Sequence, residues 1–291
     1  MTSFTREFKV RHYECDAYGH VNNANYLRYM EQAAIEASAA VGYDDARYTA
    51  LGTMWLIRET DIEYLLPLKM DDVVAVKTWV ADFRRVRSQR RYEFTRVGDG
   101  ALVARATTDW VYMDRATQRP VSVTPEMIAA YCPDGTPEPT PRERIAAAPP
   151  PPPRPHTMQR RVEWRDIDMA QHVNNATYLN YMEECGIQSL DGFGWSVDRL
   201  AAVGIAIVAR RHQIEYQQPA LLGDMLRVTT FLADVRRATA VRHFTIVREK
   251  DNVLLARARS QWVFMNPTSL QPARVPEAVM NDFAEHIAKG I

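Results

Sequence analysis

The chain has 291 residues, about twice the roughly 150 residues of an average domain. Its 46% hydrophobic and 25% charged residues are ordinary for a globular protein. The 36 basic and 36 acidic residues leave no net charge, which argues against general affinity for nucleic acid. No run of about 18 apolar residues occurs, so we expect no membrane span.

The elements of the first half can be predicted from residue periodicity. Residues 4–14 alternate in polarity and predict a strand. Asn22 or Asn23 can cap a helix that runs to about Ala40, and Gly42 then ends it. Four further strands are expected near residues 53–65, 72–83, 87–97 and 101–113. A strand, a helix and four strands in this order favour an α+β fold, with one long helix packed on an antiparallel sheet.

The second half repeats the first. Residues 16–31 return as residues 168–183, with eleven of sixteen positions identical at a shift of 152 residues. The same shift matches Ile62-Glu63-Tyr64 with residues 214–216, and no net gap is needed. Such self-similarity indicates two copies of one fold, so helices are predicted at 23–41 and 175–190.

A proline-rich segment separates the two copies. Residues 133–157 include five consecutive prolines, Pro149 to Pro153, which exclude both helix interior and central strand. We therefore predict an N-terminal domain at 1–132, a linker at 133–157 and a C-terminal domain at 158–291.

The N-terminus and the cysteines bear on the cellular compartment. The first residues are charged from Arg6 onward and lack the apolar stretch of a secretory signal, which predicts a cytoplasmic protein. The three cysteines, Cys15, Cys132 and Cys185, are odd in number and have no metal-like spacing. Cys15 lies beside Asp16 and could be a nucleophile, but we favour a small core residue in a reducing cytosol.

The duplicated motif contains the residues most suited to chemistry. Asp16 and Asp168 precede a helix, where a carboxylate can act as general base or nucleophile, although an Asp before a helix is more often a turn or cap residue. The paired asparagines that follow open each helix, where unpaired N–H groups and the macrodipole can hold an oxyanion. Capping alone is the alternative, and both roles can coexist. The joint recurrence of Asp, His and two Asn favours catalysis.

Other polar residues are less specific. His20 and His172 lie four residues after each Asp, too few ligands for zinc, so we expect an orienting hydrogen bond or a structural role, with no metal and no cofactor. Glu63 and Glu215 alternate with apolar residues on a strand and can be merely solvated. Eight arginines either bind phosphates or lie on a solvated strand face, namely Arg84, Arg85, Arg87, Arg90, Arg91, Arg236, Arg237 and Arg242.

The motif resembles a known enzyme family. Asp-x-x-Gly-His-Val-Asn-Asn-x-x-Tyr at 16–26 resembles the hotdog-fold thioesterases of the 4-hydroxybenzoyl-CoA thioesterase-like branch. The stretch 168–175 is similar to plant acyl-ACP thioesterases, which are themselves tandem hotdogs. The resemblance implies two tandem hotdog domains arranged as a pseudo-dimer, with active sites formed between hotdogs.

The resemblance also implies roles for individual residues. Asp16 and Asp168 match the catalytic carboxylate, and the backbone N–H groups of Asn23 and Asn175 match the oxyanion donor. Three further positions match polar site residues of the plant enzymes, namely His20, His172 and Glu215 with its copy Glu63. The sequence departs from the plant pattern at Ala170, and at Tyr18 in the first copy, where those enzymes carry Asn.

These observations predict an acyl thioesterase that hydrolyses an acyl-CoA or acyl-ACP, with a homo-oligomer of double-hotdog chains as a possibility. One alternative is a hotdog enoyl-thioester hydratase or dehydratase, but those enzymes place the His five residues after the Asp instead of four. A non-catalytic acyl-CoA-binding protein is the other, and it would not need an Asp in each copy.

Overall fold

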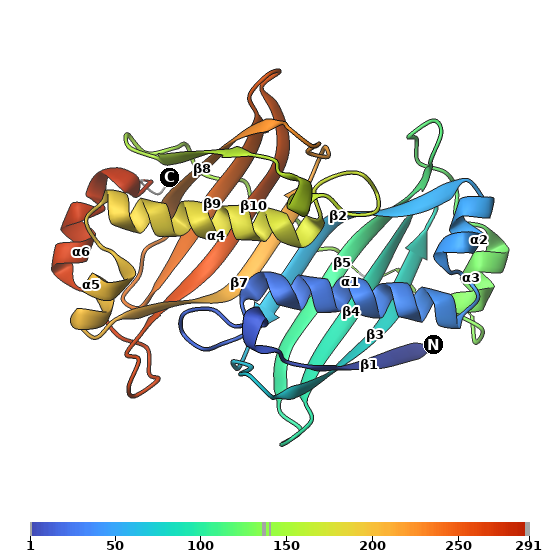
Figure 1. The fold of residues 1–291 in the computed structure, drawn as a ribbon, viewed down its shortest axis with the longest axis horizontal. Coiled ribbons are helices and arrows are strands. Elements are labelled where there is room, and N and C mark those ends of the chain that lie inside the picture. Colours follow the sequence, from blue (N-terminus) through green and yellow to red (C-terminus); the bar gives the residue numbers. More distant parts are fainter. Residues whose placement is uncertain (1, 136–137, 140, 289–291) are drawn as a thin grey trace. The chain divides into compact units, whose positions relative to one another are not determined.

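The computed structural model describes residues 2–135, 138–139 and 141–288. The chain divides into two compact units, Met1–Glu143 and Arg144–Ile291, and each is described by itself. Both units have the predicted α+β architecture of a hotdog domain, one long helix on an antiparallel sheet (Figure 1). The exact domain and linker boundaries, and the pseudo-dimer arrangement, stay predictions.

The N-terminal unit contains five strands and a long helix, α1 (Asn23–Ala40). The strands are β1 (Ser3–Lys9), β2 (Thr53–Tyr64), β3 (Val73–Arg84), β4 (Arg87–Arg96) and β5 (Leu102–Asp114). They lie in the order β1-β3-β4-β5-β2, and every neighbouring pair is antiparallel. Two short helices complete the unit, α2 (Asp45–Ala50) and α3 (Pro125–Tyr131).

The C-terminal unit repeats this plan around α4 (Asn175–Gly192) (Figure 1, yellow). Its strands are β6 (His156–Arg161), β7 (Ala206–Tyr216), β8 (Met225–Ala233), β9 (Thr239–Arg248) and β10 (Val253–Met265). They lie in the order β7-β10-β9-β8-β6, the same connectivity as in the first unit, and neighbours are again antiparallel. The short helices are α5 (Val197–Ala202) and α6 (Glu277–Asp282).

Local sequence explains where the long helices begin and end. The Asn22 side chain accepts a hydrogen bond from the Ala24 N–H at 3.0 Å, and Asn174 caps α4 in the same way. After each last turn a glycine takes the left-handed conformation, Gly42 at φ +83° and Gly194 at φ +77°. The predicted helix boundaries are therefore confirmed for α1, and α4 extends two residues beyond its predicted end.

The core of each unit lies between helix and sheet. In α1 four residues at helical spacing are all buried, namely Tyr26, Met30, Ala33 and Ala37. The Tyr26 ring packs on Phe94 of β4 and on Tyr64 of β2, at centroid distances of 5.5 and 5.1 Å. The alanines add little volume, so the helix backbone can lie close to the sheet.

Two predictions near the N-terminus were wrong. The first strand ends at Lys9 instead of continuing to residue 14, because His12–Glu14 forms a turn of 3-10 helix that leads the chain toward α1. Cys15 follows this turn and is only partly buried, so it is not the core residue expected. Alternation of polarity continues through the turn, which is why it was not separated from the strand.

Part of the proline-rich segment is held against the first sheet. Arg142 donates hydrogen bonds to Asp109 of β5 at 2.9 Å and to Asp82 of β3 at 2.8 Å. Both carboxylates are almost fully buried and lie in one cross-strand row with Gln89. Arg142 bridges the two buried acids, which also pair with Arg84 at 3.6 Å and with Arg87 at 3.4 Å, so their negative charges are compensated.

Candidate active site

The two duplicated loops that precede the long helices have the same backbone turn. In the first copy the Asp16 N–H donates to the His20 carbonyl at 2.8 Å, and the Gly19 N–H to the Asp16 carbonyl at 2.9 Å. In the second copy the matching bonds, from Asp168 and from Gln171, are both 3.0 Å long. Gly19 and Gln171 have φ of +74° and +65°. Glycine adopts this conformation freely, whereas glutamine is strained there.

The two aspartates have different partners within this shared turn. Asp16 Oδ1 accepts the backbone N–H groups of Tyr18 and His20, at 2.9 and 3.2 Å. Asp168 Oδ1 accepts the Ala170 N–H at 2.8 Å, and Asp168 Oδ2 accepts a long hydrogen bond from the side-chain amide of Asn174 at 3.5 Å.

The second copy also brings its histidine side chain to the carboxylate. His172 Nδ1 lies 3.8 Å from Asp168 Oδ1 and 3.2 Å from the Val173 carbonyl, and both side chains are about four-fifths buried, at 20% and 22% exposure. In the first copy His20 contacts Asp16 through its backbone. The structure therefore brings Asp, His and Asn side chains together most closely around Asp168.

The first turn of each long helix lies next to its aspartate and is hydrogen-bonded to the sheet. Asn23 and Asn175 are the first residues of α1 and α4, so their N–H groups precede the intrahelical hydrogen bonds. The Tyr64 hydroxyl donates to the Asn23 carbonyl at 3.3 Å, and Tyr216 does the same for Asn175 at 3.2 Å. Each tyrosine ties the first helical turn to the sheet.

A loop between β7 and β8 supports the second copy of the site. The Val173 N–H donates to the Ala220 carbonyl at 3.0 Å, and the Ala220 N–H donates to the Tyr178 hydroxyl at 2.9 Å. Burial raises the pKa of Tyr178 to about 12, so the hydroxyl stays protonated. The loop thereby connects the residue after His172 with the first turns of α4.

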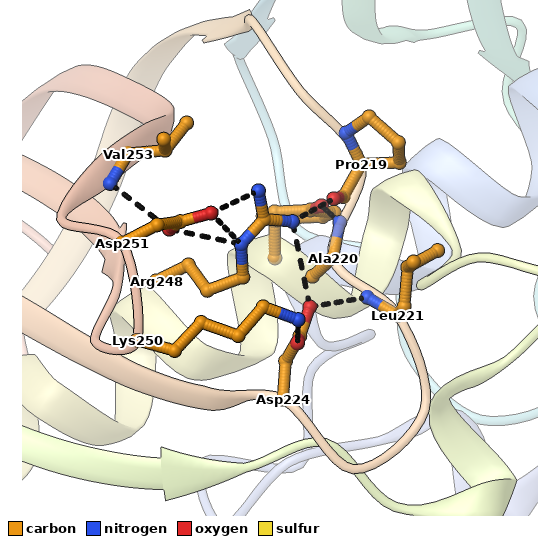
Figure 2. Close-up of polar contacts among 9 residues, drawn as sticks. Pro219, Ala220, Leu221, Asp224, Arg248, Lys250, Asp251 and Val253 are labelled. Atoms are coloured by element: carbon orange, nitrogen blue, oxygen red, sulfur yellow. Dashed lines mark hydrogen bonds and ion pairs between the residues drawn. The ribbon is translucent and has the colours of Figure 1, made fainter.

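Charged side chains hold this loop in place (Figure 2). Arg248 Nη1 donates to the Pro219 carbonyl at 3.4 Å and lies 3.6 Å from Asp224, while its Nε and Nη2 bind Asp251. Asp224 also accepts from Lys250 at 2.7 Å and from the Leu221 N–H at 3.0 Å. Arg248 was not predicted from the sequence. Its counterpart at the 152-residue shift, Arg96, makes similar contacts with Asp99 and the Pro67 carbonyl, so this support is duplicated as well.

Each of the two predicted glutamates forms an ion pair with an arginine on the adjacent strand of its own unit. Glu63 and Glu215 accept hydrogen bonds from Arg105 and Arg257, each at 2.6 Å. In each strand the glutamate precedes the buried tyrosine that binds the helix start, so its side chain points to the opposite face of the sheet. A role for these glutamates in the site stays a prediction.

Two pairs among the predicted arginines lie at the far end of their own sheets. Arg84 ends β3 and Arg85 follows it, and Arg236 and Arg237 lie in the turn after β8. Within its unit, each pair is separated from the loop beside the aspartate by the length of a strand, roughly 40 Å for the twelve residues of β3 and roughly 30 Å for the nine residues of β8. The structure does not bring them to the Asp and His of the same copy.

Neither a metal cluster nor a membrane helix is found in the described part of the chain. No group of three or more His, Cys, Asp or Glu residues in residues 2–135, 138–139 and 141–288 could hold a metal ion. Across the same residues, no helix is both long enough and apolar enough to cross a membrane.

Comparison with known proteins decides the family. The model of the thioesterase-like superfamily matches residues 10–131 and again residues 162–283, two segments offset by the same 152 residues. The chain belongs to the thioesterase-like superfamily. Its predicted enzyme class, a thioester hydrolase, is confirmed by this membership and by curated relatives that are thioesterases.

Individual relatives cover one copy or both. The acyl-CoA thioester hydrolase YbgC of Escherichia coli is 30% identical over 125 residues, which are 43% of this chain and 92% of that protein. The long-chain acyl-CoA thioesterase FadM of Escherichia coli is 30% identical over 134 residues, 45% of this chain and 98% of that protein.

Solved structures of two acyl-ACP thioesterases share the double fold. One from Bacteroides thetaiotaomicron has a TM-score of 0.70 at 18% identity and covers 90% of this chain and 97% of its own. The 12:0-ACP thioesterase from Umbellularia californica also has a TM-score of 0.70 at 18% identity, with coverage of 90% and 94%. At this identity the likeness is one of fold.

Proposed function

We propose that this thioesterase-like protein hydrolyses an acyl-CoA or acyl-ACP thioester to the free acid and the thiol. The observation that carries the proposal is the geometry around Asp168. Its carboxylate is held beside the His172 ring and the Asn174 amide, directly before the first turn of α4. A base or nucleophile next to an oxyanion-stabilising helix start is what acyl transfer needs.

In the general-base form of the reaction, the aspartate takes a proton from water as the water oxygen attacks the thioester carbonyl carbon. The carbonyl oxygen becomes an oxyanion, stabilised by the Asn175 N–H and the positive end of the helix dipole. Collapse of this intermediate breaks the C–S bond, releases the thiolate and leaves the acid. The proton on the aspartate is then available for the leaving thiolate.

In the nucleophilic form, the carboxylate attacks the same carbon and displaces the thiolate, and water then hydrolyses the mixed anhydride. His172 orients the reacting group in either form. We propose the same roles for Asp16, His20 and Asn23 in the first copy. Label found in the aspartate after a single turnover in ¹⁸O-water identifies the nucleophilic form, because the label enters that carboxyl group when water attacks the aspartyl carbonyl of the mixed anhydride.

The test is a double variant, Asp16→Asn with Asp168→Asn, assayed for thiol release from acyl-CoA thioesters of several chain lengths. Removal of a general base lowers turnover by roughly 10²–10⁴-fold. The matched control is Asp71→Asn, which removes an exposed carboxylate that pairs with Lys9 at 3.0 Å. We expect the control to hydrolyse at the wild-type rate. Full activity in the folded double variant would exclude both aspartates from the chemistry.

A further inference from the structure

A buried arginine lies beneath the far end of α4. Arg242 of β9 is only 5% exposed, and its counterpart Arg90 in β4 is only 6% exposed. Each donates from Nη1 to a threonine of the adjacent strand at 3.4 Å, Thr230 and Thr78 respectively. The duplication has thus kept a buried guanidinium at a position that the reaction proposed above does not use.

The described residues that hydrogen-bond to Arg242 are neutral. Its Nη1 donates to Ser189 at 3.1 Å and lies 3.5 Å from His286 Nε2. His286 Nδ1 is 3.0 Å from the Arg154 carbonyl and must carry the ring proton, so Nε2 is an acceptor. Burial lowers the pKa of His286 to about 4, which keeps the ring uncharged at neutral pH. No Asp or Glu in the described chain offsets the charge.

Two nitrogens of Arg242 have no hydrogen-bond partner among the described residues, namely Nε and Nη2. His156 is the cross-strand partner of Thr230, to which Arg242 donates, and the buried Nε2 of His156 also has no partner among the described residues. A buried charge without a counter-charge costs several kcal/mol of folding free energy, so a bound anion would stabilise the protein at this position.

The open edge is the one that other arginines of this chain use for carboxylates. Arg96 binds Asp99 through Nε and Nη2, at 3.0 and 2.6 Å. Arg248 binds Asp251 through the same two atoms, at 3.0 and 2.8 Å. Side-on, two-point pairing of this kind is the strongest geometry between guanidinium and carboxylate.

In the first copy an aromatic ring lies beside the buried arginine and partly compensates its charge. The Arg90 guanidinium lies 5.8 Å from the centre of the Tyr131 ring, whose face attracts a cation. The matching residue of the second copy is Phe283, which packs instead on Phe193 at 4.7 Å. The charge of Arg242 is therefore the less compensated of the two.

We propose that Arg242, with His156 Nε2 beside it, binds a carboxylate beneath the C-terminal half of α4. The proposal rests on the proposed thioesterase activity where the carboxylate is the distal end of an acyl substrate. Ser189 follows Asn175 by fourteen residues, about 21 Å along the helix at 1.5 Å per residue. A long acyl thioester with its carbonyl at the helix start and a carboxylate at its other end can match this separation in length. A free carboxylate is the other source.

Two arms of one experiment separate these sources. The first compares kcat/KM for the mono-CoA thioester of hexadecanedioic acid with that for palmitoyl-CoA, which has the same length. We expect the carboxylated substrate to be preferred, and Arg242→Met to reduce the preference by roughly 10- to 100-fold, the effect of one charge-assisted hydrogen bond. The second arm measures the rise in melting temperature with free succinate and hexadecanedioate.

Arg90→Met is the matched control, because it removes an equally buried guanidinium from the other copy and should change neither the preference nor the melting response. Stabilisation by free carboxylates without a substrate preference assigns the site to a free ligand. Absence of both effects in the wild type overturns the proposal. If Arg242→Met does not fold, Arg242→Lys tests the two-point pairing. Failure to hydrolyse any acyl-CoA counts against the proposed function alone, since the melting arm is independent of activity.

Discussion

Asp168→Asn should slow hydrolysis far more than Asp16→Asn. The two turns share a backbone, but in the second turn side chains reach the carboxylate: His172 Nδ1 lies 3.8 Å from the Asp168 carboxylate and the Asn174 amide donates to it at 3.5 Å. Asp16 Oδ1 instead accepts two backbone N–H groups, as a turn-forming aspartate does. The second copy therefore has the more complete arrangement of side chains for acyl transfer.

The expected loss of kcat distinguishes one dominant site from two equal sites. If Asp168 supplies the base for nearly all turnover, Asp168→Asn costs roughly 10²–10⁴-fold in kcat, or about 3–5 kcal/mol of barrier. Two equal and independent sites would leave each single variant with about half of the wild-type kcat. Asparagine is isosteric, and its Oδ1 can still accept the Ala170 N–H, so folding should be preserved.

The assay is continuous detection of released CoA with a thiol-reactive chromogen, at several concentrations of one acyl-CoA that the wild type hydrolyses. Thermal unfolding of both variants serves as the control for folding. A twofold loss in each variant would show two equivalent sites. A larger loss in Asp16→Asn would reverse the assignment, and either result refutes the inference from side-chain geometry.

Three further predictions concern the support of the second site. Tyr178→Phe should lower the free energy of unfolding by about 1–3 kcal/mol, because the Ala220 N–H loses its acceptor, and an unchanged urea midpoint would contradict this. Burial raises the pKa of Asp224, but the hydrogen bonds from Lys250 and the Leu221 N–H, with the charges of Lys250 and Arg248, together outweigh it and hold the pKa below the ordinary 3.8. The stabilisation is thus present above pH 3.8 and lost as the pH falls through the lowered pKa. Acid titration of unfolding should show this loss in the wild type and less of it in Asp224→Asn. Gln171→Gly should relieve backbone strain of up to about 1 kcal/mol and raise the melting temperature; a lower kcat in the same variant would show that the side chain assists the reaction.

The repeat and its periodicities allowed the long elements to be predicted. Helix and strand residues recur at fixed spacing, and the 152-residue shift tested each assignment twice, so α1 and the four strands after it lie within two residues of their predicted bounds. The short helices α2 and α3 were not predicted. Each is stabilised by a capping side chain, Asp44 and Thr124, and by packing against residues far away in the chain. One or two turns carry too little periodicity to reveal this.

The candidate site could be predicted only where its residues are close in sequence. Asp, His and Asn lie within seven residues of one another, and the sequence therefore showed them together. Tyr178 and Arg248 act on the site through backbone groups of a loop that is distant from them in the chain. Backbone partners leave no trace in residue type, so neither side chain could be recognised from spacing. Arg242 was expected at a phosphate site or on a solvated strand face, but it is buried beneath α4, because its guanidinium hydrogen-bonds side chains that come from distant parts of the chain.

The duplication also explains how the two copies can differ without loss of the fold. Asn22 and Asn174 have φ and ψ of −57° and 138°, and −58° and 139°, so the backbone at the helix start is the same in both copies. The differences are confined to side chains around that backbone, such as Gln171 in place of Gly19. Glycine at φ +74° is free of strain, whereas Gln171 at φ +65° is not. A strained residue next to His172 is retained more readily if its side chain contributes to function, which again favours the second copy as the more active one.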